Sequence, residues 1–104
     1  LKMVRRAQDQ GYFVTVVYLW LASPEIAVRR VAARVEAGGH SVPEAVIRRR
    51  YYTGLHYFFE DYAPACDKWI LVDNTHATFD PVAEGSRKGM TVRNLDLYEL
   101  IKSL

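Results

Sequence analysis

The sequence has very little cysteine: Cys66 is the single one among 104 residues. One thiol cannot form an internal disulfide, so the composition predicts a reducing compartment, and we expect a cytoplasmic protein. We interpret Cys66 as a small buried hydrophobic residue rather than a nucleophile. The longest apolar stretch, residues 14–22, is far shorter than the ~20 residues that span a bilayer, so no membrane association is expected.

Strong charge of either sign is also missing. Fourteen Lys and Arg residues stand against twelve Asp and Glu residues, which gives a net charge of +2. This balance is too mild to indicate nucleic-acid binding, so no nucleic-acid partner is expected and any basic site must be local. The histidines show no paired spacing with other metal-ligating residues, and no metal site is predicted.

Hydrophobic patterns predict an α/β fold in one domain, residues 1–104. Residues 12–21 and 68–73 are rich in β-branched and aromatic residues and are nearly continuously apolar. Such stretches are typical of parallel strands that are buried on both faces. Helices are predicted at 23–37 and 42–62. The remaining predicted elements are a first helix, a hairpin and a last helix, at residues 1–10, 79–93 and 94–104.

Apolar residues at helical spacing predict which faces of these helices are buried. The tryptophans and tyrosines are interpreted as core residues as well. The predicted stripes are Val28, Val31 and Val35 in the first central helix, Ile47, Tyr51, Leu55, Phe58 and Tyr62 in the second, and Leu97, Leu100, Ile101 and Leu104 in the last helix, which Asn94 is expected to cap.

The two central helices are predicted to meet at a glycine hinge, Gly38-Gly39. Glycine closes a helix because it reaches positive φ without a Cβ clash. Ser41 and Glu44 have the spacing of a capping box for the second helix, and Pro43 fits its first turn. The sequence therefore predicts two helices joined by a short, mobile connection.

Five arginines lie near this hinge: Arg30, Arg34, Arg48, Arg49 and Arg50. A guanidinium group meets phosphate oxygens two at a time, so this cluster fits a lid that closes over a phosphate-bearing ligand. The alternative is a set of solvated helix faces. A rotation of ~100° per residue places Arg49 opposite the apolar stripe and Arg48 and Arg50 on its flanks.

Two further positions fit a binding role. Asn74 follows the second strand, and ligands bind at the carboxyl edge of open α/β sheets, although an Asx turn that closes the strand is an equal alternative. His40 lies in the hinge and could contact a phosphate or be incidental. No G-x-x-x-x-G-K-[ST] phosphate loop occurs, and the nearest glycine pair, Gly85 and Gly89, lacks the lysine.

Four segments of the sequence together resemble the carboxyl-terminal half of the zeta-toxin-like ATPases, a group of P-loop kinases. They are residues 16–25, residues 30–44 with the sequence Gly-Gly-His-Ser-Val-Pro-Glu, Ile-Arg-Arg-Arg-Tyr at 47–51 and Asp-Asn at 73–74. The resemblance runs from about Gly11 to the last helix. It implies a partial three-layer αβα P-loop-kinase-like fold, with parallel core strands and a helical lid hairpin.

The resemblance also implies roles for individual residues. Arg48 and Arg50 would be catalytic, as contacts of the transferred phosphate. Among the predicted cofactor-binding residues, the resemblance implies Arg34 as a phosphate contact, His40 as the hinge and Asn74 near the adenine. Arg30 and Arg49 are added to this set from the arginine cluster. ATP with Mg²⁺ would serve the whole kinase, which would phosphorylate a hydroxyl of a small molecule, such as a nucleotide-activated amino sugar. An antitoxin is a possible partner.

The family's phosphate loop, magnesium-holding residue and catalytic aspartate would lie upstream of Leu1, which is not a methionine. We therefore expect a part of a kinase that is inactive alone and binds ATP only weakly. Such a part would bare apolar sheet surface, which predicts a homo-oligomer. The alternative is a non-catalytic protein-interaction module or a truncated remnant.

Overall fold

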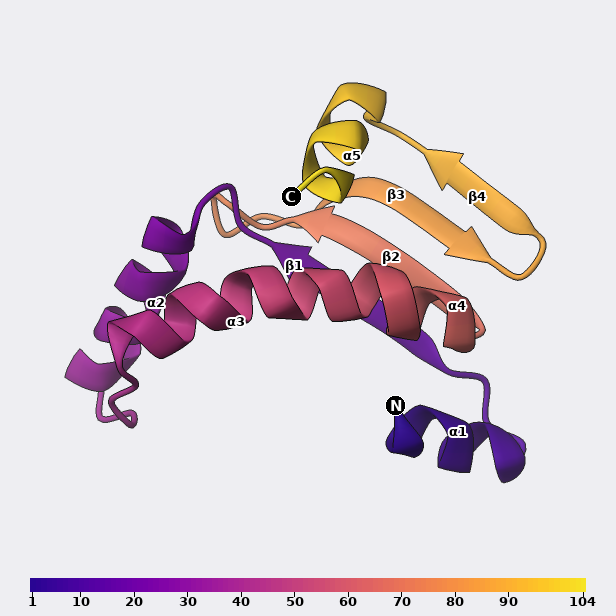
Figure 1. Cartoon of the computed structure of the whole chain (residues 1–104), viewed down its shortest axis with the longest axis horizontal. Helices are drawn as coiled ribbons and strands as arrows, with labels where there is room; N and C mark the ends of the chain where they lie inside the picture. Colours follow the sequence, from indigo (N-terminus) through magenta and orange to yellow (C-terminus); the bar gives the residue numbers. More distant parts are fainter.

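The computed structural model describes residues 1–104, which form a four-stranded sheet with helices packed on it (Figure 1). The α/β class predicted from the sequence is confirmed. The elements in chain order are α1 (Lys2–Asp9), β1 (Thr15–Trp20), α2 (Pro24–Glu36), α3 (Glu44–Tyr57), the π-helical segment η1 (Phe58–Tyr62), α4 (Ala63–Ala65), β2 (Lys68–Asp73), β3 (Asp80–Ser86), β4 (Gly89–Val92) and α5 (Leu95–Lys102).

The strands lie in the order β1-β2-β3-β4. Strands β1 and β2 run parallel, with Val16 opposite Trp69 and Tyr18 opposite Leu71. The β2–β3 and β3–β4 pairs are antiparallel, so the predicted parallel pairing is limited to β1 and β2. The hairpin predicted at residues 79–93 is confirmed: β3 ends at Ser86 and β4 begins at Gly89, so Arg87 and Lys88 form the turn.

Strand β1 is buried on one face only. Its residues Val16, Tyr18 and Trp20 contribute to the core, and the ring of Tyr18 lies 5.1 Å from that of Phe58. On the opposite face Val17 and Leu19 are 46% and 53% exposed. The prediction that residues 12–21 are buried on both faces is wrong, because the helices cover only the face of β1 that carries Val16, Tyr18 and Trp20.

The core lies between the sheet and the α3–η1 helix. This helix crosses the sheet in Figure 1. Leu55 and Phe58 of this helix are 1% exposed and pack with Trp69 and Leu71 of β2. The helical path continues past the predicted end at residue 62 to Ala65, through η1 and α4. The expected buried stripe of α3 is thus correct at its centre, while its two ends are half-buried.

Two other predicted stripes are wrong in part. Helix α2 has no buried residue, because it packs mainly on α3 rather than on the sheet. In α5, Ile101 is buried as predicted, but Leu100 and Leu104 are exposed. Tyr98 is buried in their place because its ring packs 6.1 Å from that of Phe59.

Helix caps agree with the sequence prediction at one of two places. Asn94 caps α5 as expected, since its Oδ1 accepts the N–H of Leu97 at 3.1 Å. The capping box predicted at Ser41 and Glu44 is wrong. Helix α3 begins at Glu44 itself, with Pro43 in the capping position, and the carboxylate of Glu44 binds Arg48 instead. No helix in the structure is both long and apolar enough to cross a membrane.

Asp67 links helix α1, the start of β1 and the β3–β4 hairpin, next to the amino-terminal ends of β1 and β2. Its Oδ2 accepts the backbone N–H of Val14 at 2.7 Å and the side-chain amide of Gln8 at 3.3 Å, and Arg87 lies 3.7 Å from its Oδ1. The Val14 hydrogen bond, followed by the Gln8 bond, holds the pKa of Asp67 below its usual value. The ionised carboxylate therefore stabilises the folded chain.

We expect Asp67→Asn to lower the melting temperature at neutral pH. A carboxyl group whose folded pKa is depressed stabilises the fold above its unfolded pKa, and this stabilisation disappears as the pH falls through the folded pKa. The difference between the parent and the variant should therefore shrink to zero in acid, as followed by circular dichroism. Asp9→Asn changes an exposed carboxylate without a hydrogen bond and serves as the control. A difference that persists unchanged at low pH would contradict the assignment.

Candidate anion site between helices α2 and α3

Helix α2 lies beyond the carboxyl end of β1 and packs against the first part of α3, whose remainder crosses the sheet (Figure 1). The chain turns between them at Gly38, which has a φ of +98°. The N–H of Gly39 donates to the Arg34 carbonyl at 2.7 Å, and a Cβ on Gly39 would lie 2.8 Å from the same oxygen. Both glycines are therefore required by this turn, which confirms the predicted glycine connection.

A cleft of about 340 Å³ lies between this helix pair and the end of β1. Its walls are mostly apolar, and its two charged residues are Arg34 and Arg50. The lining residues are Tyr18, Leu19, Leu21, Ala27, Val31, Arg34, Val42, Ile47, Arg50 and Tyr51. Small-molecule sites are commonly concave and apolar with a few polar groups.

The two arginines of the cleft come from different helices, Arg34 from α2 and Arg50 from α3. Both side chains are exposed, and neither forms an ion pair with a carboxylate. Their positive charges therefore remain available to a ligand in the cleft. This is the arrangement that the predicted phosphate contacts require.

Arg48 is bound differently. Its guanidinium lies 2.8 Å from Glu25 and 2.9 Å from Glu44, so it ties the first turn of α2 to the first turn of α3. The hydrogen bond to Arg48 lowers the pKa of Glu25, and the bond to Glu25 raises the pKa of Arg48. The catalytic role of Arg48 stays a prediction, and a phosphate would have to replace one of these carboxylates.

Arg30 and Asn74, both predicted to bind a cofactor, contact each other. One guanidinium nitrogen of Arg30 donates to Asn74 Oδ1 at 2.6 Å, and the other donates to the carbonyls of Asn74 and Thr75 at 2.5 and 3.2 Å. The side chain of Asp73 accepts the N–H of Thr75 at 3.0 Å, which is the Asx turn that the sequence left as an alternative. These contacts hold α2 against the end of β2.

A second cleft, of about 270 Å³, adjoins the first and includes Arg30, Arg34 and Asn74 in its lining. Arg34 lines both clefts, together with Leu19, Leu21, Ala27 and Val31. Arg49 and His40 are exposed and line neither cleft. Their predicted binding roles therefore have no support from the position of their side chains and stay predictions.

The tyrosines of the cleft were predicted from the sequence only as core residues, not as part of a site. The Tyr51 hydroxyl donates to the Leu21 carbonyl at 2.5 Å, whereas the Tyr18 hydroxyl has no hydrogen-bond partner. Burial, with a smaller effect of neighbouring Tyr51, raises the pKa of Tyr18 to about 12. Alternation along β1 could have placed Tyr18 on the helix-covered face, but not beside Arg34 and Arg50.

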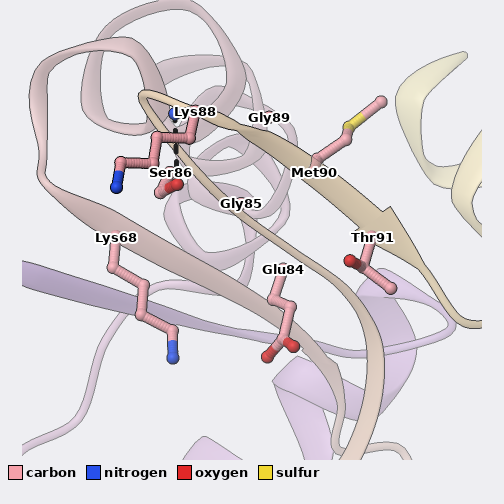
Figure 2. A pocket seen from close by; sticks show the side chains of 8 residues that line it. All are labelled: Lys68, Glu84, Gly85, Ser86, Lys88, Gly89, Met90 and Thr91. Atoms are coloured by element: carbon pink, nitrogen blue, oxygen red, sulfur yellow. Dashed lines mark hydrogen bonds between the residues drawn. The ribbon is translucent and has the colours of Figure 1, made fainter.

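A larger cleft of about 480 Å³ lies at the β3–β4 hairpin (Figure 2). Lys68 and Lys88 line it together with two hydroxyl side chains, Ser86 and Thr91. Figure 2 shows that Glu84 points to the same side of the sheet as Lys68. Glu84 adds a carboxylate to the lining of this cleft, which opposes anion binding, so the α2–α3 cleft is the stronger candidate.

Comparisons with known proteins add a relative but no function. A segment of 51 residues is 31% identical to an uncharacterized protein of Haemophilus influenzae. This segment is 49% of the chain and 36% of the relative, so the chain matches about a third of that protein's length. No protein-family model matches the chain. No solved structure matches it either.

Proposed function

We propose that this chain is the lid-bearing half of an ATP-dependent small-molecule kinase of the zeta-toxin-like type. The observation that carries the proposal is the pair Arg34 and Arg50, which line one apolar cleft from two helices on either side of a glycine turn. Neither arginine is neutralised by a carboxylate. The resemblance of the hinge and arginine phrases to the family supports the same assignment.

The chemistry of phosphoryl transfer fits this arrangement. The transferred group spreads negative charge over its outer oxygens, and catalysis consists mainly of positioning and of stabilising that charge. Guanidinium groups on two helices can approach a phosphate from two sides, and a turn that requires glycine can act as the joint. A phosphate loop and a magnesium-holding residue would have to come from another part of the kinase.

The proposal includes a specific fold: the sheet and its helices are part of a larger, three-layer αβα fold like that of P-loop kinases. In a P-loop-kinase-like αβα fold, further strands and helices would cover the exposed face and unpaired edge of β1. The exposed apolar residues Val17 and Leu19 support this, because an isolated sheet face in water is normally polar. A strand followed by a Gly-Lys-Ser/Thr loop, encoded upstream of Leu1 in the gene, is the expected finding.

The binding of phosphate compounds to this chain tests the proposed site. We expect weak binding of ATP and inorganic pyrophosphate in isothermal titration calorimetry, because only one side of the nucleotide site is present. Arg34→Ala and Arg50→Ala should each weaken it by about 10-fold or more, since a hydrogen bond to a charged group contributes roughly 1.5–3 kcal/mol. Arg49→Ala, on the outer face of α3, is the matched control.

Three results would contradict the proposal. Equal affinity in all three arginine variants and the parent would make the cleft irrelevant to phosphate. Steeply salt-dependent binding of DNA or RNA, without a response to pyrophosphate, would favour a nucleic-acid binder instead. An interaction module would bind neither class of compound.

The uncovered strand β1 also supports self-association, which the sequence predicts. Its sequence, Thr-Val-Val-Tyr-Leu-Trp, contains no charge that would protect an open edge. We expect a homodimer in sedimentation velocity, formed by β1 edges that pair in antiparallel fashion about a two-fold axis. Val17→Lys should shift the chain to monomer, whereas a parent that is monomeric at high concentration would contradict the prediction.

A further inference from the structure

We propose that Tyr18 is a third ligand-binding residue of the α2–α3 cleft, whose hydroxyl donates a hydrogen bond to the anionic group that Arg34 and Arg50 bind. This inference rests on the proposed function, because it concerns the same site. It extends the site from the two helices to the central sheet.

The hydroxyl of Tyr18 stands out among the tyrosines that are not exposed. Tyr51, Tyr62 and Tyr98 each have a hydrogen-bond partner for their hydroxyl group, namely the Leu21 carbonyl, the terminal amine and the Met90 sulfur. The Tyr18 hydroxyl has none. The hydroxyl is not enclosed in the interior, because Trp20 Nε1 is the one buried side-chain polar atom without a partner. It reaches the open cleft that Tyr18 lines, and since no protein group competes for it, it can donate to a ligand there.

The surroundings of Tyr18 hold the hydroxyl in place. Its ring packs against Phe58, with 5.1 Å between the ring centroids, and its oxygen lies beside Gly54, where a Cβ would be 3.5 Å away. Because the ring is fixed on β1, the hydroxyl needs little ordering when a ligand binds. Preorganised donors of this kind contribute more to affinity than mobile ones.

The chemistry of the hydroxyl suits an anion. Burial raises the pKa of Tyr18 to about 12, so the group stays protonated at physiological pH and can donate. Two guanidinium groups and one neutral hydroxyl then give a set of donors with no acceptor carboxylate, as a phosphoryl group requires. The Tyr51 hydroxyl is already used by the Leu21 carbonyl and serves the fold.

Tyr18→Phe tests this inference with inorganic pyrophosphate as the probe. We expect the affinity to fall by about 3- to 10-fold, the effect of one hydrogen bond. The melting temperature should not fall, because the hydroxyl has no partner in the unliganded chain. Tyr52→Phe, on the exposed side of α3, is the matched control and should bind as the parent does. In chains labelled at the tyrosine Cζ atom, the Tyr18 signal should shift when pyrophosphate is added.

The outcomes separate this inference from the proposed function. If the arginine variants lose affinity while Tyr18→Phe binds as the parent does, the Tyr18 assignment is wrong and the arginine site stands. If Tyr18→Phe lowers the melting temperature, the hydroxyl holds the fold and the assignment is also wrong. If the parent does not bind pyrophosphate at all, both are overturned.

Discussion

Replacing Gly85 with alanine should lower the free energy of unfolding by about 3 kcal/mol, at the upper end of the usual cost of overpacking a core. A Cβ at this position would lie 2.5–2.6 Å from three atoms of the Trp69 indole ring. The ring cannot move away easily, because Trp69 is only 9% exposed and packs edge-on against Phe58 at 5.8 Å. Either the β2–β3 pair or the core must therefore shift.

Gly54→Ala, in contrast, should raise the free energy of unfolding. Gly54 lies inside α3, and the nearest atom to an added Cβ is the Tyr18 hydroxyl oxygen at an ordinary contact distance of 3.5 Å. Alanine is favoured over glycine in a helix interior, so this variant should gain up to about 1 kcal/mol. Urea unfolding followed by circular dichroism measures both variants. Similar shifts of the two midpoints in one direction would contradict the packing around Trp69.

The element types could be predicted because their signals are local. Strand β2 has the predicted limits, 68–73, since its apolar run is bounded by polar residues. The Asn94 cap and the glycine turn at 38–39 each depend on a few neighbouring residues, whose backbone geometry the sequence specifies directly. Such features do not depend on what packs against them.

Burial could not be predicted in the same way, because it depends on distant neighbours. The apolar run of β1 is the same whether one or both faces are covered, and only the tertiary structure shows that helices cover one face and leave Val17 and Leu19 exposed. In α5 the choice of Tyr98 over Leu100 depends on Phe59, which lies almost forty residues earlier in the chain. A hydrophobic pattern indicates which residues can be buried, not which ones are.

The candidate site shows the same limit. Helical rotation placed Arg48 and Arg50 on equivalent flanks of α3, but their environments differ. Arg48 meets Glu25, which is 23 residues away, whereas Arg50 lines the cleft beside Arg34. This difference comes from tertiary contacts, whereas helical periodicity alone predicts the same role for both arginines. In the proposed kinase we therefore expect a clearer effect from replacing Arg50 than from replacing Arg48.

In a protein that joins this chain to a phosphate loop, Arg50→Ala should lower kcat for ATP-dependent phosphoryl transfer by about 10³-fold, the lower end of the effect of an arginine that stabilises the transferred group. The KM for ATP should change much less, because the charge that Arg50 meets is greatest in the transition state. Steady-state kinetics with saturating acceptor separates the two parameters.

Arg49→Ala is the control for this kinetic experiment, because its side chain is exposed and lies outside the cleft. It should leave kcat nearly unchanged.

Arg48→Ala gives a third comparison: a loss as large as that of Arg50→Ala would mean that Arg48 leaves Glu25 and Glu44 when the lid closes. A small loss would fit an ion pair on the protein surface, which usually contributes less than about 1 kcal/mol. Equal, small losses for Arg49 and Arg50 would show that Arg50 is a surface residue, and the lid assignment would then be wrong.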